Sequence, residues 1–195
     1  MGNWFTKLYD ALASLSSGKD ARILMLGLDA AGKATILYKI KPNENLQTIP
    51  TTGFDVKMVR ACKGISFTVW DVGGQDKMKR LWKYYYPGAE GLVYVIDSND
   101  RERIEQSKSE LHEILKSPEM THIPIVVIAN KQDLKDVMSC SEIVQKLGLN
   151  ELNGKHRWYI QGACAINGDG LLDSMLEMLR FIKEYRKSNG DYSNY

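Results

Sequence analysis

Residues 27–34 combine glycine, lysine and small side chains at the spacing of a phosphate-binding loop. They read Gly-Leu-Asp-Ala-Ala-Gly-Lys-Ala, between a short apolar run and a segment of helical pattern. Glycines let successive backbone N–H groups point at phosphate oxygens, and Lys33 would reach the outer two phosphates. The alternative, a glycine-rich turn with an exposed lysine, is disfavoured by the order of strand, loop and helix. The candidate contacts are Gly27, Asp29, Ala30, Ala31, Gly32, Lys33, Ala34 and Thr35.

Position 34 departs from the phosphate-loop pattern. The residue after the lysine is normally Ser or Thr, whose hydroxyl ligates Mg²⁺, but Ala34 has no side-chain oxygen. Thr35 comes next, but one step along a helix turns a side chain by about 100 degrees. We therefore do not expect Thr35 to replace the missing ligand directly, and we expect Mg²⁺ to be held less tightly.

A second polar segment has the composition of a loop that recognises guanine. Asn130, Lys131, Gln132 and Asp133 follow the apolar run 126–128 and resemble the N-K-x-D guanine signature. The Asp133 carboxylate can accept from two N–H groups on one edge of guanine, a donor pair that adenine lacks. Lys131 can lie along the base, and Asn130 can tie this segment to the phosphate loop. Four polar residues after a strand are often only a loop, but their distance after a phosphate loop favours a binding site.

Residues 71–75 read Asp-Val-Gly-Gly-Gln after another apolar run, which is the D-x-x-G pattern. Asp71 would bind Mg²⁺ through a water molecule, and the Gly74 N–H would meet the γ-phosphate. Gln75 lies where a residue that positions the attacking water belongs, so it is the candidate catalytic residue. The alternatives are a strand-end cap for Asp71 and an exposed polar loop residue for Gln75.

Thr51 matches the threonine that closes over Mg²⁺ when a γ-phosphate is present. It is a candidate contact of both the nucleotide and the metal. Residues 46–49 contain no arginine, so this segment supplies no arginine finger. We therefore expect slow hydrolysis without an activating partner.

The first residues fit a lipid anchor. Residues 1–6 match the M-G-x-x-x-[ST] signal for N-myristoylation at Gly2. Trp4, Leu8, Leu12 and Leu15 share one face of a predicted helix over residues 1–17. Because a single myristoyl chain binds membranes only marginally, an amphipathic helix would be a suitable second signal. The alternative is a helix that packs on the domain, and both can hold in different nucleotide states.

Apolar runs alternate with helical patterns between these motifs. Such alternation predicts an α/β domain over residues 18–187, with a mostly parallel sheet and helices on both faces. A hairpin around residues 62–64 would add an antiparallel edge strand. We expect residues 188–195 to form a disordered tail. The runs read as strands are 23–26, 56–60, 65–70, 92–96, 125–128 and 158–160, and those read as helices are 33–40, 104–114, 143–147 and 171–182.

Composition limits the classes of protein that fit. The chain has 195 residues and a net charge of +2, which indicates one domain and no nucleic-acid partner. Cys62, Cys140 and Cys164 are far apart and have neither disulfide nor metal-ligand spacing. No apolar run approaches the length of about 18 residues that spans a membrane, and we expect no secretory signal.

The chain resembles the ADP-ribosylation factor family of small GTPases from Met1 to about Arg186. The stretches that carry the resemblance are MGNWF, GLDAAGK, TIPTTGFDV, FTVWDVGGQDK, LVYVIDSNDRERI, IANKQDL, WYIQGACA and GDGLL. The resemblance implies a Ras-like P-loop GTPase domain with a six-stranded sheet. It also implies that Cys164 and Ala165 form a second guanine-contacting loop, in which the Ala165 N–H meets the base oxygen.

The resemblance further implies a monomeric switch between cytosolic GDP and membrane-bound GTP states. Its partners would be an exchange factor, a GTPase-activating protein and coat or effector proteins at Golgi or endosomal membranes. Ala34, Ile166 and Asp55 depart from the family's usual residues. Ala34 supports a second hypothesis, a GDP-biased or non-cycling adaptor that binds the family's regulators. A P-loop ATPase or kinase is disfavoured because the Asp133 loop selects guanine.

Overall fold

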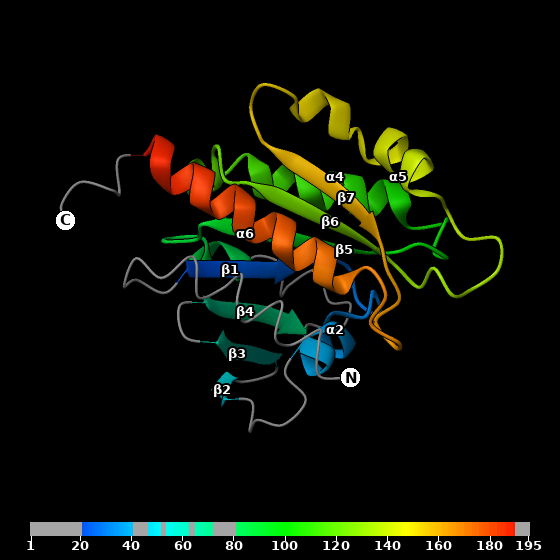
Figure 1. Ribbon diagram of the computed structural model, residues 1–195, viewed down its shortest axis with the longest axis horizontal. Coiled ribbons are helices and arrows are strands. Elements are labelled where there is room, and N and C mark those ends of the chain that lie inside the picture. The colour runs from blue at the N-terminus through cyan, green and yellow to red at the C-terminus, as the bar shows by residue number, and fades with distance from the viewer. Residues whose placement is uncertain (1–20, 41–46, 52–53, 63–64, 72–80, 190–195) are drawn as a thin grey trace.

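The computed structural model describes residues 21–40, 47–51, 54–62, 65–71 and 81–189, and between 47 and 71 it describes only the backbone (Figure 1). The elements alternate along the chain as the sequence predicts. The strands are β1 (Ala21–Leu26), β2 (Gln47–Thr51), β3 (Phe54–Cys62), β4 (Ile65–Asp71), β5 (Gly91–Asp97), β6 (Ile125–Asn130) and β7 (Trp158–Gly162). The α-helices are α2 (Lys33–Ile40), α4 (Ile104–Leu115), α5 (Cys140–Leu147) and α6 (Leu171–Ser188), with short 3₁₀ turns at Trp82–Tyr85, Pro118–Met120 and Leu149–Leu152.

The strands form one sheet in the order β2-β3-β4-β1-β5-β6-β7. The pairs from β4 through β1, β5 and β6 to β7 are all parallel, whereas β3 is antiparallel to both of its neighbours. The sequence predicted six strands with the antiparallel strand at the edge, and both details need correction. The described residues contain seven strands, because β2 hydrogen-bonds along the outer side of β3 and takes the edge position.

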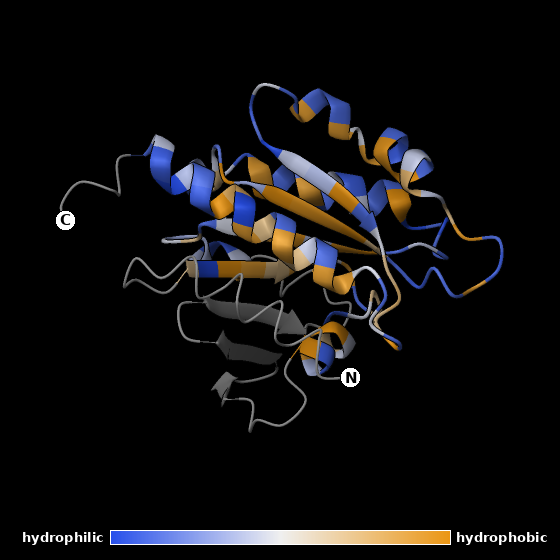
Figure 2. Cartoon of the chain, viewed as in Figure 1, coloured by the Kyte–Doolittle hydropathy of each residue, from blue (hydrophilic) through white to orange (hydrophobic). Residues whose placement is uncertain are grey.

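Both faces of the sheet are covered by helices (Figure 1). Alternate residues of a strand point to opposite faces, so Ile23 and Met25 of β1 join a buried cluster with α2 and α6. Leu24 and Leu26 of the same strand join a second cluster with α4 and α5. Figure 2 shows the result as central strands that are mostly hydrophobic and helices that are hydrophobic on one side and hydrophilic on the other. This burial fixes the central strands and therefore the loops at their ends.

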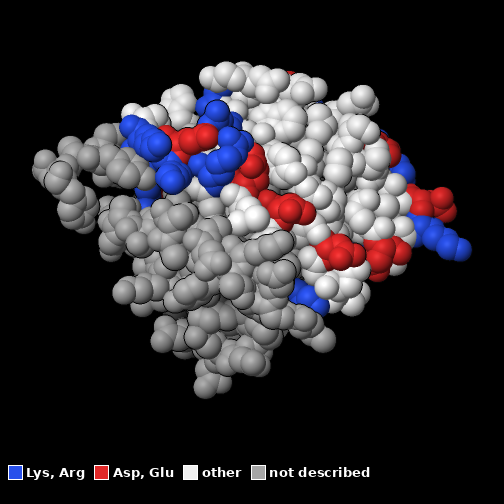
Figure 3. Space-filling view, in the orientation of Figure 1, with Lys and Arg blue, Asp and Glu red and all other residues white. Residues whose placement is uncertain are grey.

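Helix α6 crosses one face of the sheet and is anchored at its C-terminal end by a buried ion pair. Arg186 donates to both carboxylate oxygens of Glu90, from Nε at 2.7 Å and from Nη2 at 2.8 Å. The outer side of α6 is charged, with basic side chains gathered towards its C-terminal end (Figure 3). No helix in the described part of the chain is long and apolar enough to cross a membrane.

Candidate nucleotide-binding site

The phosphate loop packs so closely against its surroundings that two positions require glycine. Gly27 follows β1 with φ +146°, and a Cβ there would lie 2.3 Å from the carbonyl oxygen of Val95 in β5. Gly32 has φ +98°, and a Cβ there would lie 2.3 Å from the side-chain nitrogen of Asn130. The spacing of the two glycines in the sequence therefore has a steric cause, which is contact with β5 and with the end of β6.

Lys33 begins α2, and its side chain turns back over the loop. The residue is only 2% exposed, and its Nζ donates to the carbonyl oxygens of Gly27 at 3.1 Å and of Leu28 at 2.7 Å. A buried ammonium therefore lies at the start of a helix, where backbone N–H groups already favour an anion. Within the same loop Ala30 is exposed with φ +59°, and Ala31 is buried.

The described residues offer Mg²⁺ no protein ligand at position 34. Ala34 is half-buried next to Lys33, and Thr35 is exposed. Asp71 ends β4, the strand next to β1, at the same edge of the sheet as the phosphate loop. Thr51 ends β2, which is three strands from β1, or about 14 Å at roughly 4.8 Å per strand. Only the backbone is described at Thr51 and Asp71, so their contacts with Mg²⁺ stay predictions.

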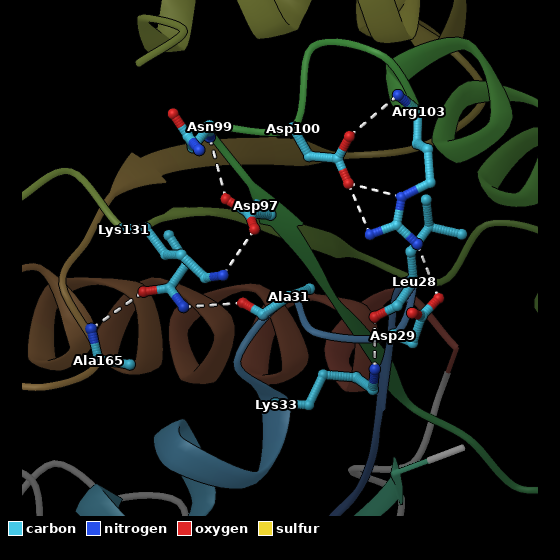
Figure 4. A network of polar contacts seen from close by, with 11 residues as sticks. Leu28, Asp29, Ala31, Lys33, Asp97, Asn99, Asp100, Arg103, Lys131 and Ala165 are labelled. Carbon is cyan, nitrogen blue, oxygen red and sulfur yellow. Dashed lines mark hydrogen bonds and ion pairs between the residues drawn. The ribbon is translucent and has the colours of Figure 1, made fainter. Parts of the chain in front are cut away.

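Asn130 joins three segments of the candidate site. Asn130 is only 2% exposed. Its Nδ2 donates to the Ala31 carbonyl at 2.8 Å, and its Oδ1 accepts from the Ala165 N–H at 2.9 Å. Figure 4 labels Ala31 and Ala165, the residues at the two ends of this bridge. The phosphate loop, the end of β6 and the loop after β7 are therefore held together by one side chain. The family resemblance implies that the Ala165 N–H meets the base oxygen. In the structure this N–H donates to Asn130, so a base oxygen would have to share it.

The loop after β7 is also held from α2. Lys39 of α2 donates from Nζ to the Ile166 carbonyl at 3.0 Å. Cys164 is buried, and its N–H donates to the Asp169 carbonyl while its own carbonyl accepts from Gly168. Ile166 is exposed. These bonds fix the backbone on which the predicted base contacts, Cys164 and Ala165, lie.

The predicted guanine loop leaves β6 with a fixed backbone and an exposed carboxylate. Lys131 has φ +66°, and its Nζ lies 2.6 Å from an Asp97 carboxylate oxygen. The Gln132 N–H donates to the Ala163 carbonyl, and its side-chain amide donates to Ser98 Oγ at 2.9 Å. Asp133 is exposed next to this anchored segment. Its carboxylate is therefore accessible to a ligand, whereas the residues that place it are tied to β5 and β7.

The loop between β5 and α4 contacts both nucleotide loops, and none of its residues was predicted to belong to the site. Asp97 pairs with Lys131, and Arg103 pairs with Asp29 of the phosphate loop at 2.8 Å. Asp100 holds the same guanidinium at 2.6 Å, and this hydrogen bond is the largest cause of a raised Arg103 pKa. These pairs join residues far apart in the sequence, so local spacing gave no signal of them. Figure 4 shows the chain of contacts they make.

Three predicted residues lie outside the described part of the chain. Gly2, Gly74 and Gln75 fall in residues 1–20 and 72–80, so their roles in lipidation, phosphate binding and catalysis stay predictions. The described residues contain no group of three or more His, Cys, Asp or Glu side chains able to hold a metal ion.

Comparisons with known proteins give a family match and a fold match. A sequence profile of the ADP-ribosylation factor family matches residues 8–182. Among solved structures, the chain is similar to Arl6 (BBS3), a small GTPase of Trypanosoma brucei that carries the nucleotide analogue GppNp. The two are 28% identical with a TM-score of 0.73, and the match covers 86% of this chain and 99% of the trypanosome chain.

Proposed function

Because the chain belongs to the ADP-ribosylation factor family of small GTPases, we propose that it cycles between GDP and GTP and regulates intracellular membrane traffic. The GDP form is cytosolic and the GTP form binds the cytosolic face of Golgi or endosomal membranes, where it recruits coat or effector proteins. The protein acts as a monomer. An exchange factor loads GTP, and a GTPase-activating protein ends the signal.

The buried Asn130 side chain is the observation that carries the nucleotide part of this proposal. It bonds to the phosphate loop through Ala31 and to the predicted base loop through Ala165. A single nucleotide has phosphates at one end and a base at the other, so a site for it needs both loops at a fixed separation. Asn130 fixes that separation through hydrogen bonds within the chain, and a site held in this way has a lower ordering cost of binding.

Hydrolysis of GTP is the reaction that the proposed cycle requires. Gln75 would orient the attacking water, and Lys33 would stabilise charge on the outer phosphates. Without an arginine in residues 46–49, the unassisted reaction is slow and an activating protein has to supply the missing charge. The membrane half of the cycle requires myristate on Gly2 together with the apolar face of the helix predicted for residues 1–17.

Ala34 favours a second candidate function, that of a GDP-biased or non-cycling adaptor. A methyl group replaces the hydroxyl that ligates Mg²⁺ in this position of the phosphate-loop pattern. GTP depends more than GDP on a well-placed metal, because the γ-phosphate and Mg²⁺ together order the switch segment. A chain that holds GDP and binds regulators without cycling would bind its nucleotide through Lys33 and the base loop. The metal would contribute little to that binding.

Nucleotide titration of the full chain, with and without Mg²⁺, tests both candidates. Guanine nucleotides should bind and adenine nucleotides should not. Asp133→Asn should weaken GTP binding and favour xanthine nucleotides, because it breaks a charge-assisted pair of hydrogen bonds worth on the order of 1.5–3 kcal/mol each. Asp136→Asn is the matched control, an exposed aspartate in the same loop whose φ of +56° asparagine tolerates.

The outcomes separate the two candidates. Unchanged GTP affinity in Asp133→Asn would reject the guanine assignment altogether. If GDP binds and GTP fails to bind even with Mg²⁺ in excess, the adaptor replaces the switch. If both bind and release depends on Mg²⁺, the switch stands.

A further inference from the structure

The phosphate loop contains an acidic side chain, which is unfavourable in a site for polyanions. Asp29 lies between Gly27 and Lys33, in a segment whose backbone and helix start both favour negative ligands. A carboxylate beside nucleotide phosphates would repel them, and a triphosphate more than a diphosphate because it carries more charge. The site therefore needs a cation to compensate Asp29.

Arg103 is that cation in the structure. Its Nη1 lies 2.8 Å from Asp29 Oδ1, and both side chains are only about one-third exposed, at 34% and 36%. Lys33 meanwhile donates to the backbone carbonyls of Gly27 and Leu28. The acid and the lysine of the loop thus have separate partners, as Figure 4 shows.

Arg103 is held in place from the other side by Asp100. The Arg103 Nε donates to Asp100 Oδ2 at 2.6 Å, and its backbone N–H donates to Asp100 Oδ1 at 3.1 Å. These bonds fix the guanidinium at the start of α4, an element whose Ile104, Leu111 and Ile114 are buried in the core. A partner fixed in this way loses little further entropy when it pairs with Asp29.

We propose that Arg103 is a positioning residue for nucleotide binding, which neutralises Asp29 so that the phosphate loop accepts a triphosphate. The inference rests on the proposed function and adds to it a residue outside the phosphate-loop, guanine and switch motifs. The proposal predicts that substitutions of Arg103 and Asp29 change GTP binding in opposite directions, which an ion pair with only a structural role would not do. Removing Arg103 should weaken GTP binding, whereas removing the Asp29 charge should strengthen it.

The experiment measures release of fluorescent GDP and GTP analogues from the full chain. Arg103→Met should accelerate GTP release about five-fold and GDP release about two-fold. These effects lie at the low end of the interaction energies measured for contacting charges, because the Arg103–Asp29 pair is partly exposed. Asp29→Asn should slow GTP release about two-fold, and the double variant should lie close to the wild type. Raising the salt concentration should reduce each difference.

Arg101→Met is the matched control. Arg101 lies in the same loop but pairs with Glu142 of α5 and donates to the Asp136 carbonyl. Because these contacts do not involve the phosphate loop, release of both nucleotides should match the wild type. A five-fold acceleration in this control would overturn the proposal, since the effect would then belong to the loop and not to Asp29.

Three further results would overturn the proposal. Arg103→Met could release GTP as slowly as the wild type. Asp29→Asn could fail to offset the Arg103 substitution, which would mean that Arg103 acts through Asp100 and α4. Asp29→Asn alone, which needs no change to Arg103, could leave GTP release equal to or faster than that of the wild type. A wild-type chain that binds neither nucleotide would instead reject the proposed function itself, and with it the role of Arg103.

Discussion

At the scale of single residues, Ala34 has the clearest expected effect on nucleotide preference. Ala34→Thr restores a hydroxyl beside Lys33, so Mg²⁺ gains a direct ligand. Nucleotide release should slow, the fraction loaded with GTP should rise, and release should become more dependent on Mg²⁺. Measuring release with and without a chelator tests this expectation. Ala34→Val is the matched control, because valine has the shape of threonine without its oxygen and should change none of the three.

The opposite result would also be informative about Ala34. If Ala34→Thr leaves GTP affinity and Mg²⁺ dependence unchanged, another group already supplies the ligand. The GDP-biased adaptor would then lose its main support.

A second prediction for a single residue concerns Asn130, whose side chain makes hydrogen bonds to two buried backbone groups. Asn130→Ala should lower the free energy of unfolding by about 2–4 kcal/mol, since the Ala31 carbonyl and the Ala165 N–H both lose their partner. Chemical denaturation at fixed nucleotide concentration measures this change. Asn150→Ala, at an exposed position, should change stability by less than about 0.5 kcal/mol. Equal losses in the two variants would contradict the bridging role.

Sequence reasoning found the candidate residues that lie in local patterns and missed those that meet only in the folded chain. Gly27, Gly32 and Lys33 could be placed in one loop because the glycine and lysine spacing is itself the signal. Arg103 is 74 positions from Asp29, and no local periodicity connects them. Nothing in the sequence indicated that Asn130 accepts a hydrogen bond from the Ala165 N–H, because only the folded chain brings these two residues together.

At the scale of elements, the strands with two buried faces were the easiest to predict. Residues 23–26, 92–96 and 125–128 are continuous apolar runs, and they lie in β1, β5 and β6. Strand β2 was missed because Pro50 lies within it, and proline removes a donor from a strand. The missing N–H donor is tolerated in an edge strand, because one side of that strand has no neighbouring strand to accept a hydrogen bond. Pro50, which made β2 hard to predict, is therefore compatible with the position of β2 at the edge of the sheet.

Helix α6 gives a prediction at this scale, because Arg186 is 5% exposed at the side chain and its partner Glu90 is 17% exposed. Arg186→Met should lower the free energy of unfolding by about 2–4 kcal/mol, since Glu90 would stay buried without its cation. Adding Glu90→Gln should recover a substantial part of the loss.

Thermal and denaturant unfolding of the four combinations measures the Arg186–Glu90 coupling. Arg180→Met is the control on the same helix, where the arginine pairs with Glu177 and Glu184 in solvent and should contribute at most about 1 kcal/mol. A loss in Arg180→Met as large as that in Arg186→Met would contradict the assignment of the anchor to Glu90.

At the scale of the whole molecule, the parallel strands collect the site at one edge of the sheet. The phosphate loop, Asp97, Asn130 and Ala163 follow or end β1, β5, β6 and β7 in turn. Ligands of open α/β sheets bind at this edge because helix starts and loop N–H groups converge there. A nucleotide bound at this edge would therefore contact several elements at once. In the proposed cycle, this common edge would let a phosphate influence distant segments.

In the proposed cycle, the nucleotide controls attachment of the chain to a membrane. Substitution of Gly2 tests the predicted membrane anchor. Gly2→Ala removes the acceptor for myristate. The amphipathic helix predicted for residues 1–17 should not hold the chain on a bilayer by itself, because stable anchoring takes two signals. Co-sedimentation with liposomes should therefore capture the acylated wild type loaded with GTP but not Gly2→Ala with either nucleotide. Wild-type protein produced without acylation is the control and should match the variant. Sedimentation of Gly2→Ala equal to that of the acylated chain would refute the anchor.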